Sequence, residues 1–268
     1  MTSMFENAIA RARADSQKTH AELTPQGSSD RSPNMLVRLL TPAPVKPTTM
    51  ERNKIIPEIA DKPAVTAYKV LRTRVLQRLR SNNWRKLIVT AADAGEGKTL
   101  TSCNLAVSIA RDVNQSVFLV DLDLQRPAMA SYFGLDVKLG IGDYLNGDAG
   151  IEDILYAPEG LERIVIIPNR APVENASELI GSPRMKALMQ WLRDQSGAPL
   201  AIFDMPPVLA CDDVLAFLPS VDCVLFLVAE GETERNRLAR AVEMLGEFNL
   251  LGAVLNKSRE HQKGYAYY

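Results

Sequence analysis

The chain has 268 residues, and its hydrophobic fraction of 46% is enough for one large core or two small ones. Its 31 Lys and Arg against 32 Asp and Glu give a formal net charge of -1, which excludes an overall field that attracts nucleic acid or an anionic membrane. The three cysteines, Cys103, Cys211 and Cys223, have no CxxC spacing, which predicts free thiols in a reducing compartment and argues against a zinc site.

We expect no membrane-spanning segment, because the apolar run Cys223–Ala229 is far shorter than the roughly 20 residues that cross a bilayer. Residues Met1–Ala10 have neither the basic start nor the apolar centre of a secretion signal. The sequence therefore predicts a cytoplasmic protein.

The first part of the chain is rich in residues that disfavour a packed core. Ser, Thr, Pro, Gly and Gln dominate residues 16–50, so we predict that residues 1–55 form a disordered or weakly structured extension. The apolar run Met35–Leu40 interrupts this composition and fits either a docking segment or a transient turn.

The next segment, Val65–Arg80, has apolar residues at steps of three and four with basic residues between them. This periodicity predicts an amphipathic basic helix. The helix is either a solvated flank packed on the domain or a contact surface for a subunit or an anion.

The segment Ile88–Thr99, IVTAADAGEGKT, has the order of a strand, a phosphate-binding loop and a helix start. Glycines let backbone N–H groups turn towards phosphate oxygens, and the following helix adds its positive N-terminal dipole. Lys98 would reach the terminal phosphates and Thr99 would bind magnesium. The general pattern has glycine where this chain has Ala92, but the helical periodicity of Leu100–Ala110 supports the interpretation. The sequence thus predicts a nucleoside triphosphate site.

Apolar strand-like runs recur downstream with helical segments between them. The runs are Ser116–Asp121, Ile164–Pro168, Leu200–Phe203, Val221–Val228 and Leu251–Leu255. They are apolar throughout rather than alternating, as expected of parallel strands buried on both faces. Ser182–Arg193 and Thr233–Glu247 are long enough to be crossover helices. We therefore predict one doubly wound α/β domain of the P-loop NTPase fold over residues 56–262, with ligands beyond the carboxyl ends of its mostly parallel strands.

Acidic residues follow two of these predicted strands. Asp121 and Asp123 end one run, where a period of two would place them on the same side, and Asp204 ends another. Carboxylates suit magnesium and can orient a hydroxyl nucleophile, whereas a lone acid after a strand is more often a helix cap. Two such strand ends downstream of a phosphate loop favour the metal and catalytic interpretation. Asp212 and Asp213 begin the next helical segment, and we interpret Asp212 as its cap.

Two features close the chain. Asn256 ends the last predicted strand, where its amide could read a nucleobase edge. Residues 263–268 form a separate tail that holds three of the seven tyrosines, Tyr265, Tyr267 and Tyr268. Tyrosines without packing partners are recognition groups, substrates or part of a tail without function.

Together these motifs resemble those of the bacterial tyrosine autokinases, cytoplasmic P-loop kinases that govern extracellular polysaccharide export. The similarity covers about residues 60–268. The family's loop also lacks the first glycine of the general pattern, but it has proline where this chain has Ala94. Its Asp-x-Asp motif is similar to Asp121–Asp123, followed here by Gln125 in place of a basic residue, and its Asp-x-Pro-Pro motif is similar to Asp204–Pro207. Further similar runs are Gly140–Gly147, Ser177–Pro183 and Val254–Lys257.

The resemblance implies an ATP-dependent kinase that uses Mg²⁺ and phosphorylates its own terminal tyrosines. The implied nucleotide-binding residues are Ala94, Gly95, Glu96, Gly97, Lys98, Thr99, Leu100 and Asn256. The implied metal ligands are Thr99, Asp123 and Asp204, and the implied catalytic residues are Lys98, Asp121, Asp123 and Asp204. Asp121 is the candidate for accepting or orienting the tyrosine proton, with Asp123 as the alternative. The implied phosphoacceptors are Tyr265, Tyr267 and Tyr268.

The resemblance also implies partners. A separate subunit of this kind is activated by the cytosolic end of a membrane polysaccharide co-polymerase, which recruits it to the inner face of the cell membrane. A phosphotyrosine phosphatase is a further candidate partner, and no nucleic-acid partner is expected. The family's ring assembles through Glu-x-x-Arg-x-x-Arg, where this chain has Thr66, Lys69 and Arg72. Because lysine lacks the bidentate geometry of arginine and Thr66 removes the acid, we expect a homo-oligomer but not that ring.

Two other functions stay open. Partition and septum-positioning ATPases of the same superfamily carry a signature lysine five residues before the P-loop lysine, and Asp93 at that position counts against them. The alternative of an ATP-binding regulatory module of a polysaccharide export complex, with weak kinase activity, is kept open by the departures at Thr66 and Lys69 and by a tail with fewer tyrosines than the family's clusters. Tail phosphotyrosine would indicate the kinase, and phosphate release without it would indicate the ATPase.

Overall fold

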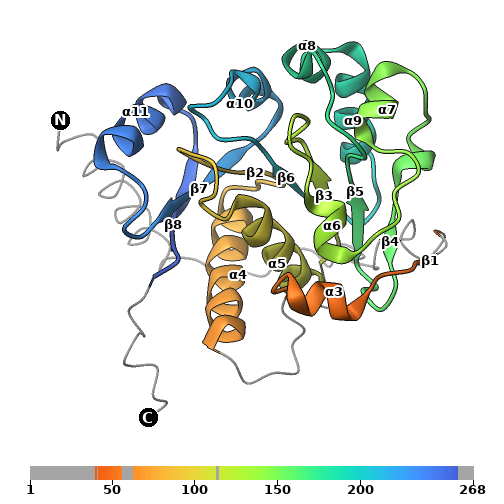
Figure 1. Cartoon of the computed structure of the whole chain (residues 1–268), viewed down its shortest axis with the longest axis horizontal. Coiled ribbons are helices and arrows are strands. Elements are labelled where there is room, and N and C mark those ends of the chain that lie inside the picture. The colour runs from red at the N-terminus through yellow and green to blue at the C-terminus, as the bar shows by residue number, and fades with distance from the viewer. Residues whose placement is uncertain (1–39, 41, 56–62, 113–114, 259–268) are drawn as a thin grey trace. The chain divides into compact units, whose positions relative to one another are not determined.

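The computed structural model describes residues 40, 42–55, 63–112 and 115–258 of the chain. Their main sheet has six parallel strands in the order β5-β3-β6-β2-β7-β8 (Figure 1). The strands are β2 (Lys86–Ala91), β3 (Val117–Asp121), β5 (Ile164–Ile167), β6 (Leu200–Asp204), β7 (Cys223–Ala229) and β8 (Leu250–Asn256). Each coincides closely with an apolar run in the sequence, which confirms the predicted parallel α/β sheet.

Helices cover both faces of the sheet, as expected of a doubly wound domain. Because side chains alternate along a strand, Leu87 and Val89 of β2 pack on one face and Ile88 packs on the other. The first face is covered by α4 (Pro63–Ser81) and α5 (Lys98–Ala110), and the second by α9 (Pro183–Arg193), α10 (Asp213–Phe217) and α11 (Arg235–Leu245). Shorter elements are α6 (Met129–Phe133), α7 (Ile141–Asn146), α8 (Ala176–Ile180), η1 (Glu152–Ile154) and η2 (Leu218–Ser220).

The predicted basic helix is α4, and it packs against α5 as a flank of the domain. Its buried residues are Val65, Val75, Leu76 and Leu79. Two of its arginines donate to backbone carbonyls of the chain: Arg72 donates to the carbonyl of Ser108 at 3.0 Å, and Arg78 donates to the carbonyl of Leu251. These contacts confirm the flank interpretation, whereas a role of α4 in subunit contact stays a prediction.

Residues 42–55 are folded, which corrects the prediction of a disordered or weakly structured extension for this part of residues 1–55. We call residues 42–55 the N-terminal strap. It contains β1 (Pro42–Ala43), which pairs in parallel with β4 (Ala157–Pro158), and α3 (Pro47–Arg52). Residues 1–39 and 41, and with them most of the run Met35–Leu40, lie outside the described part of the chain.

The strap folds because it places a few apolar groups in the core beneath α4 and α5. Ile55 is only 1% exposed, and Val45 and Met50 pack partly buried against the same core. Hydrogen bonds fix its path over α6: the backbone N–H of Lys46 donates to the carbonyl of Phe133 at 3.2 Å, and Nδ2 of Asn53 donates to the carbonyl of Ser131 at 2.8 Å. Composition alone masked these contacts, because prolines and threonines surround the apolar residues that make them.

The cysteines agree with the sequence prediction, since Cys103, Cys211 and Cys223 are all free. Cys103 and Cys223 are buried and Cys211 is partly exposed. Within the described ranges, no helix is both long enough and apolar enough to pass through a membrane.

Candidate active site

The predicted phosphate loop joins the end of β2 to the start of α5 (Figure 1). Gly95 and Gly97 have φ angles of 81° and 92°, in the left-handed region that side chains disfavour. At Gly97 a Cβ atom would also lie 2.2 Å from Nδ2 of Asn256, so only glycine fits there. Lys98, the first residue of α5, is 7% exposed, and the N–H of Thr101 donates to the carbonyl of Gly97 at 3.0 Å. The segment thus combines a glycine turn with a helix N-terminus, the arrangement of an anion site.

Glu96 ties this loop to the neighbouring strand ends. Its side chain is buried, and one carboxylate oxygen accepts a hydrogen bond from the hydroxyl of Thr233 while the other accepts from the N–H of Asp93 at 3.3 Å. The hydroxyl of Thr233 accepts in turn from the N–H of Ala229 at 2.9 Å. The carbonyl of Glu96 accepts from Nδ2 of Asn256 at 2.8 Å. The loop is therefore held in place from β7 and β8.

Asp93 forms a bidentate ion pair with Arg237 of α11. Nε of Arg237 donates to Oδ2 of Asp93 at 2.5 Å, and Nη2 donates to Oδ1. These hydrogen bonds, more than the opposing effect of burial, lower the pKa of Asp93 below its ordinary value. The position that carries the signature lysine in partition ATPases is thus occupied by an acid whose partner belongs to the same chain.

Asp121 and Asp204 lie directly opposite each other at the ends of β3 and β6. Both are completely buried, and Oδ1 of Asp121 and Oδ2 of Asp204 have no hydrogen-bond partner. Their other oxygens are used: Oδ2 of Asp121 accepts from the N–H of Met129 at 3.2 Å, and Oδ1 of Asp204 accepts from the hydroxyl of Ser102 at 3.0 Å. The side chain of Thr99 acts to lower the pKa of Asp204.

The environment of this pair raises the pKa of both carboxyl groups. Burial, and then the charge of Asp204, raise the pKa of Asp121 well above its ordinary value. Burial raises the pKa of Asp204 to about 6, against the lowering effects of Thr99, Lys98 and Ser102. A positive ion bound beside the pair would lower both pKa values again.

Asp123 lies at the more open side of the site. Its carboxylate is half-buried, and Oδ1 accepts from the N–H of Arg126 at 3.1 Å. Burial raises the pKa of Asp123, while the charge of Lys98 acts in the opposite direction. The charges of Lys98, Asp123 and Asp204 therefore act on one another, and their joint role in binding a metal nucleotide stays a prediction.

The residues present fit a magnesium nucleotide. Two unpaired buried carboxylate oxygens suit a hard cation, and the ammonium group of Lys98 suits phosphate. A Cβ atom at Gly95 would meet nothing within 4 Å, so the loop has open space on that side. Ala94 and Gly95 are exposed and Thr99 and Leu100 are partly buried along the same loop and helix start.

The structure brings the predicted binding and metal residues of the P-loop, β3 and β6 to one end of the sheet. Asn256 also reaches the loop, where one of its amide N–H groups is used by Glu96; its reading of a nucleobase stays a prediction. Asp212 does occupy the N-cap position of α10, but its side chain makes no capping hydrogen bond, which corrects the interpretation of Asp212 as a side-chain cap. The predicted phosphoacceptors Tyr265, Tyr267 and Tyr268 lie outside the described residues.

Sequence reasoning missed several residues that support the site. Ser102 could have been found, because it lies one helical turn after Lys98 and so faces the same side of α5. No pattern around Thr233 or Arg237 indicates a contact with the P-loop, since the segment that contains them was predicted only to be a crossover helix. Ser177 donates to Asp213, and that contact joins two helices that are distant in the sequence. Such contacts depend on the tertiary fold.

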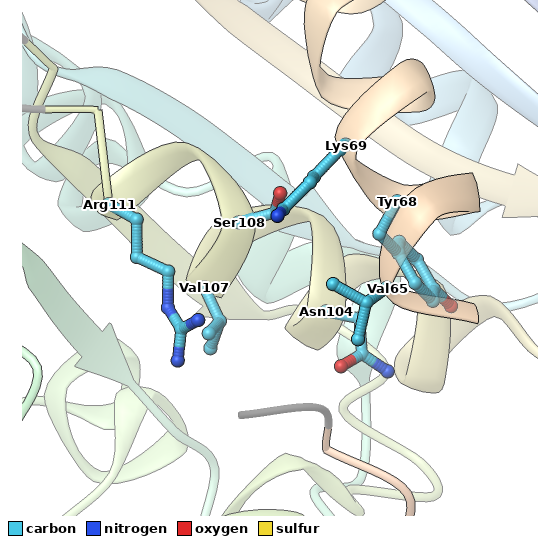
Figure 2. Close-up of a pocket in the computed structure, with 7 residues that line it drawn as sticks. All are labelled: Val65, Tyr68, Lys69, Asn104, Val107, Ser108 and Arg111. Carbon is cyan, nitrogen blue, oxygen red and sulfur yellow. The ribbon is translucent and has the colours of Figure 1, made fainter. Parts of the chain in front are cut away.

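A small pocket lies away from the P-loop, between α4 and α5 (Figure 2). Its lining residues are Val65, Tyr68, Lys69, Asn104, Val107, Ser108 and Arg111. None of these is a predicted nucleotide or metal residue. Burial is the main cause of the raised pKa of Tyr68, so this hydroxyl belongs to the packing of the two helices.

Comparison with known proteins adds family information to this geometry. The family model described as the CobQ/CobB/MinD/ParA nucleotide binding domain matches residues 87–267. Tyrosine-protein kinase YwqD of Bacillus subtilis (strain 168) is 30% identical over 204 residues, which cover 75% of this chain and 84% of that protein. The putative tyrosine-protein kinase EpsB of Ralstonia nicotianae is 29% identical over 211 residues. That match covers 78% of this chain but only 28% of EpsB, so the chain spans less than a third of this longer relative.

A solved structure extends the similarity to three dimensions. The kinase domain of the Escherichia coli tyrosine kinase ETK superposes with a TM-score of 0.67 at 25% sequence identity. The superposition covers 90% of this chain and 100% of that domain. The fold that positions the P-loop and the aspartates is therefore shared with a whole kinase domain.

Proposed function

This chain belongs to the CobQ/CobB/MinD/ParA nucleotide-binding family and, within it, to the bacterial tyrosine kinases, and from this membership we propose that it transfers phosphate from Mg-ATP to tyrosine. The observation that carries the proposal is the pair Asp121 and Asp204, buried opposite each other with one unpaired oxygen each. A cation held by Asp204 would satisfy the unpaired oxygen of Asp204 and offset the negative charge of the neighbouring Asp121, and Lys98 would bind the adjoining phosphates.

We assign the binding roles from position. Lys98 and the backbone of residues 94–100 bind the phosphates, and Thr99, Asp123 and Asp204 hold magnesium. The hydroxyl of Ser102 donates to Asp204 and keeps it in place. Magnesium, when bound, neutralises charge that develops on the phosphates during transfer. Asn256 contacts the loop through the carbonyl of Glu96, and we propose that the rest of its amide reads the nucleobase.

The proton of the acceptor tyrosine needs a carboxylate that the substrate can reach. Each of the two carboxylates has one oxygen outside its backbone hydrogen bond, but Asp121 is completely buried whereas Asp123 is only half-buried. We therefore propose that Asp123 is the carboxylate nearer the tyrosine hydroxyl. Asp121, buried opposite Asp204, would add negative charge to the metal site without touching the substrate. Transfer in such sites depends more on position and charge than on a strong base.

We further propose that the acceptors are Tyr265, Tyr267 and Tyr268, presented to a neighbouring subunit. Each phosphate adds about -1.5 to -2 charges near pH 7, which would favour release from an acidic site. The proposed context is exopolysaccharide synthesis and export, with activation and membrane recruitment by a polysaccharide co-polymerase.

Asp93 is the observation that separates this proposal from a partition-type ATPase. A signature lysine would supply a positive charge at this position, whereas Asp93 is held by Arg237 of its own chain. Arg72 of α4 is likewise engaged within the chain, by the carbonyl of Ser108. We therefore propose an oligomer assembled without the family's ring contact at α4.

The test is to incubate the protein with Mg-ATP, with and without the cytosolic fragment of its candidate co-polymerase, and to map phosphotyrosine by mass spectrometry. We expect modification of the tail, and we expect Lys98→Met to reduce it at least about 100-fold because phosphate-charge stabilisation is lost. Lys138→Met, an exposed lysine outside the site, is the matched control. Persistent phosphotyrosine in Lys98→Met would overturn the assigned role, and phosphate release without phosphotyrosine would indicate the ATPase.

A further inference from the structure

Asp213, the first residue of α10, is a buried carboxylate that the proposed mechanism does not use. Its side chain is 0% exposed, and its Oδ2 has no hydrogen-bond partner. Its Oδ1 lies 2.5 Å from the hydroxyl of Ser177, which also lies 2.6 Å from Oδ1 of the exposed Asp212. One hydroxyl proton can serve only one of these carboxylates at a time.

The chain between β6 and α10 brings Asp213 to the same end of the sheet as the P-loop. The N–H of Val208 donates to the carbonyl of Ala91 at 2.9 Å, where β2 ends, so this connection is fixed beside the loop. The charge of Asp213 contributes to the raised pKa of Asp123, which places the two carboxylates in one electrostatic environment. Asp213 therefore lies at the P-loop end of the sheet, the end at which Asp123 follows β3.

A buried carboxylate with an unpaired oxygen is costly unless a ligand satisfies it. Helix capping does not explain why Asp213 is buried, because Asp212 and not Asp213 occupies the N-cap position of α10. Direct metal coordination is already assigned to Thr99, Asp123 and Asp204. Magnesium, however, retains several water ligands in protein sites, and those waters need acceptors.

We propose that Oδ2 of Asp213 accepts a hydrogen bond from a magnesium-bound water, and that Ser177 orients Asp213 for this contact. This inference rests on the proposed function, because it requires a magnesium nucleotide at the P-loop. Asp213 is thus a positioning residue that acts through the metal's water rather than a direct metal ligand. Supporting groups of this kind change metal affinity by about 10- to 100-fold when they are lost.

The test is to measure ADP binding to the full chain by calorimetry across a range of Mg²⁺ concentrations and in EDTA. In Asp213→Asn, which keeps the shape of the side chain but replaces Oδ2 with a donor, we expect about 10-fold more Mg²⁺ to be needed for tight ADP binding. Binding of ADP in EDTA should be unchanged. Asp212→Asn, which alters the other carboxylate near Ser177, is the matched control and should behave as the wild type.

An unchanged Mg²⁺ requirement in Asp213→Asn would overturn the inference, as would an equal loss of ADP binding with and without the metal. If Asp213→Asn does not fold, Ser177→Ala replaces it; we expect a shift in the same direction, and no shift would overturn the inference. Failure of the proposed function is distinguishable. In that case the wild type would bind Mg-ADP and show the Asp213 effect, yet form no phosphotyrosine with the co-polymerase fragment.

Discussion

Asp121 and Asp204 face each other across two parallel strands, where two negative charges without a cation destabilise the fold. The ordinary pKa of Asp204, 3.8, rises to about 6 in the folded protein because the group is buried. Between these values the folded state binds more protons than the unfolded state. The free energy of unfolding of the metal-free protein should therefore fall as the pH rises from 4 through 6.

Asp204→Asn tests whether the charge of Asp204 lowers the stability of the metal-free protein while it is needed for magnesium binding. The amide carries no charge and can still accept the hydrogen bond from Ser102, so we expect the metal-free variant to be more stable than the wild type at pH 8 by on the order of 2 kcal/mol. The same variant should lose magnesium-dependent nucleotide binding. Urea unfolding in EDTA at pH 4 and pH 8 measures the effect, and equal stability of both proteins at both pH values would contradict it.

The same residues mark what local sequence patterns could predict. Lys98, Thr99, Asp121, Asp123 and Asp204 were identified because each lies at a strand end or in the glycine loop, where the chain's own order fixes the position. The pairing of Asp93 with Arg237 and of Glu96 with Thr233 was not predicted, since each contact joins β2's loop to a segment more than half the domain away. Side-chain partners of that kind follow from strand order, which local patterns do not contain.

At the scale of elements, the sheet and its long helices followed from periodicity, because buried parallel strands are continuously apolar and amphipathic helices repeat every three to four residues. The N-terminal strap did not, because two short elements and one buried side chain carry too little periodic signal. Its α3 contains a proline and two threonines, residues that composition assigns to an extension. The strap folds through contacts with α6 and with the α4–α5 core.

Ile55→Ala measures the contribution of the strap to stability. Ile55 is 1% exposed in the core beneath α4 and α5, so truncation should reduce the free energy of unfolding by about 2–5 kcal/mol. Glu51→Ala, an exposed change within the same segment, should alter it by less than about 0.5 kcal/mol. Urea denaturation of both variants compares them. Equal small effects would mean that the strap adds little to the stability of the domain.

The strap also touches the element that follows the Asp-x-Asp motif. It bonds to Ser131 and Phe133 of α6, and the N–H of Met129 at the start of α6 holds Asp121. Loosening the strap by Ile55→Ala should therefore affect the metal site as well as the core. The calorimetric measurement of Mg-ADP binding described for Asp213 gives the comparison.

At the scale of the whole molecule, the proposed reaction takes place between subunits. A mixture of full-length Lys98→Met with a wild-type chain that lacks residues 265–268 separates donor from acceptor. We expect phosphotyrosine on the tail of the Lys98→Met chain, because the truncated chain retains its P-loop and carboxylates. Each protein alone should show none, and an unmodified tail in the mixture would contradict transfer between subunits. Mass spectrometry of the tail peptide is the measurement.

The order of the strands also has a consequence for biosynthesis. Strand β2, which carries the P-loop, pairs with β6 and β7, so Lys86 finds its partner only at Ala201 and Leu87 at Cys223. During translation β2 leaves the ribosome long before either neighbour, as an apolar strand with both edges unpaired, which is a state prone to aggregation. In a chain that stops before β7, one edge of β2 stays unpaired permanently. Once all six strands have paired, ATP can bind, and it binds only the folded state. At a free ATP concentration of 100 times the dissociation constant, binding adds about 2.7 kcal/mol to the free energy of unfolding. The cell's own nucleotide pool would thus retain completed chains and leave incomplete ones to chaperones and proteases.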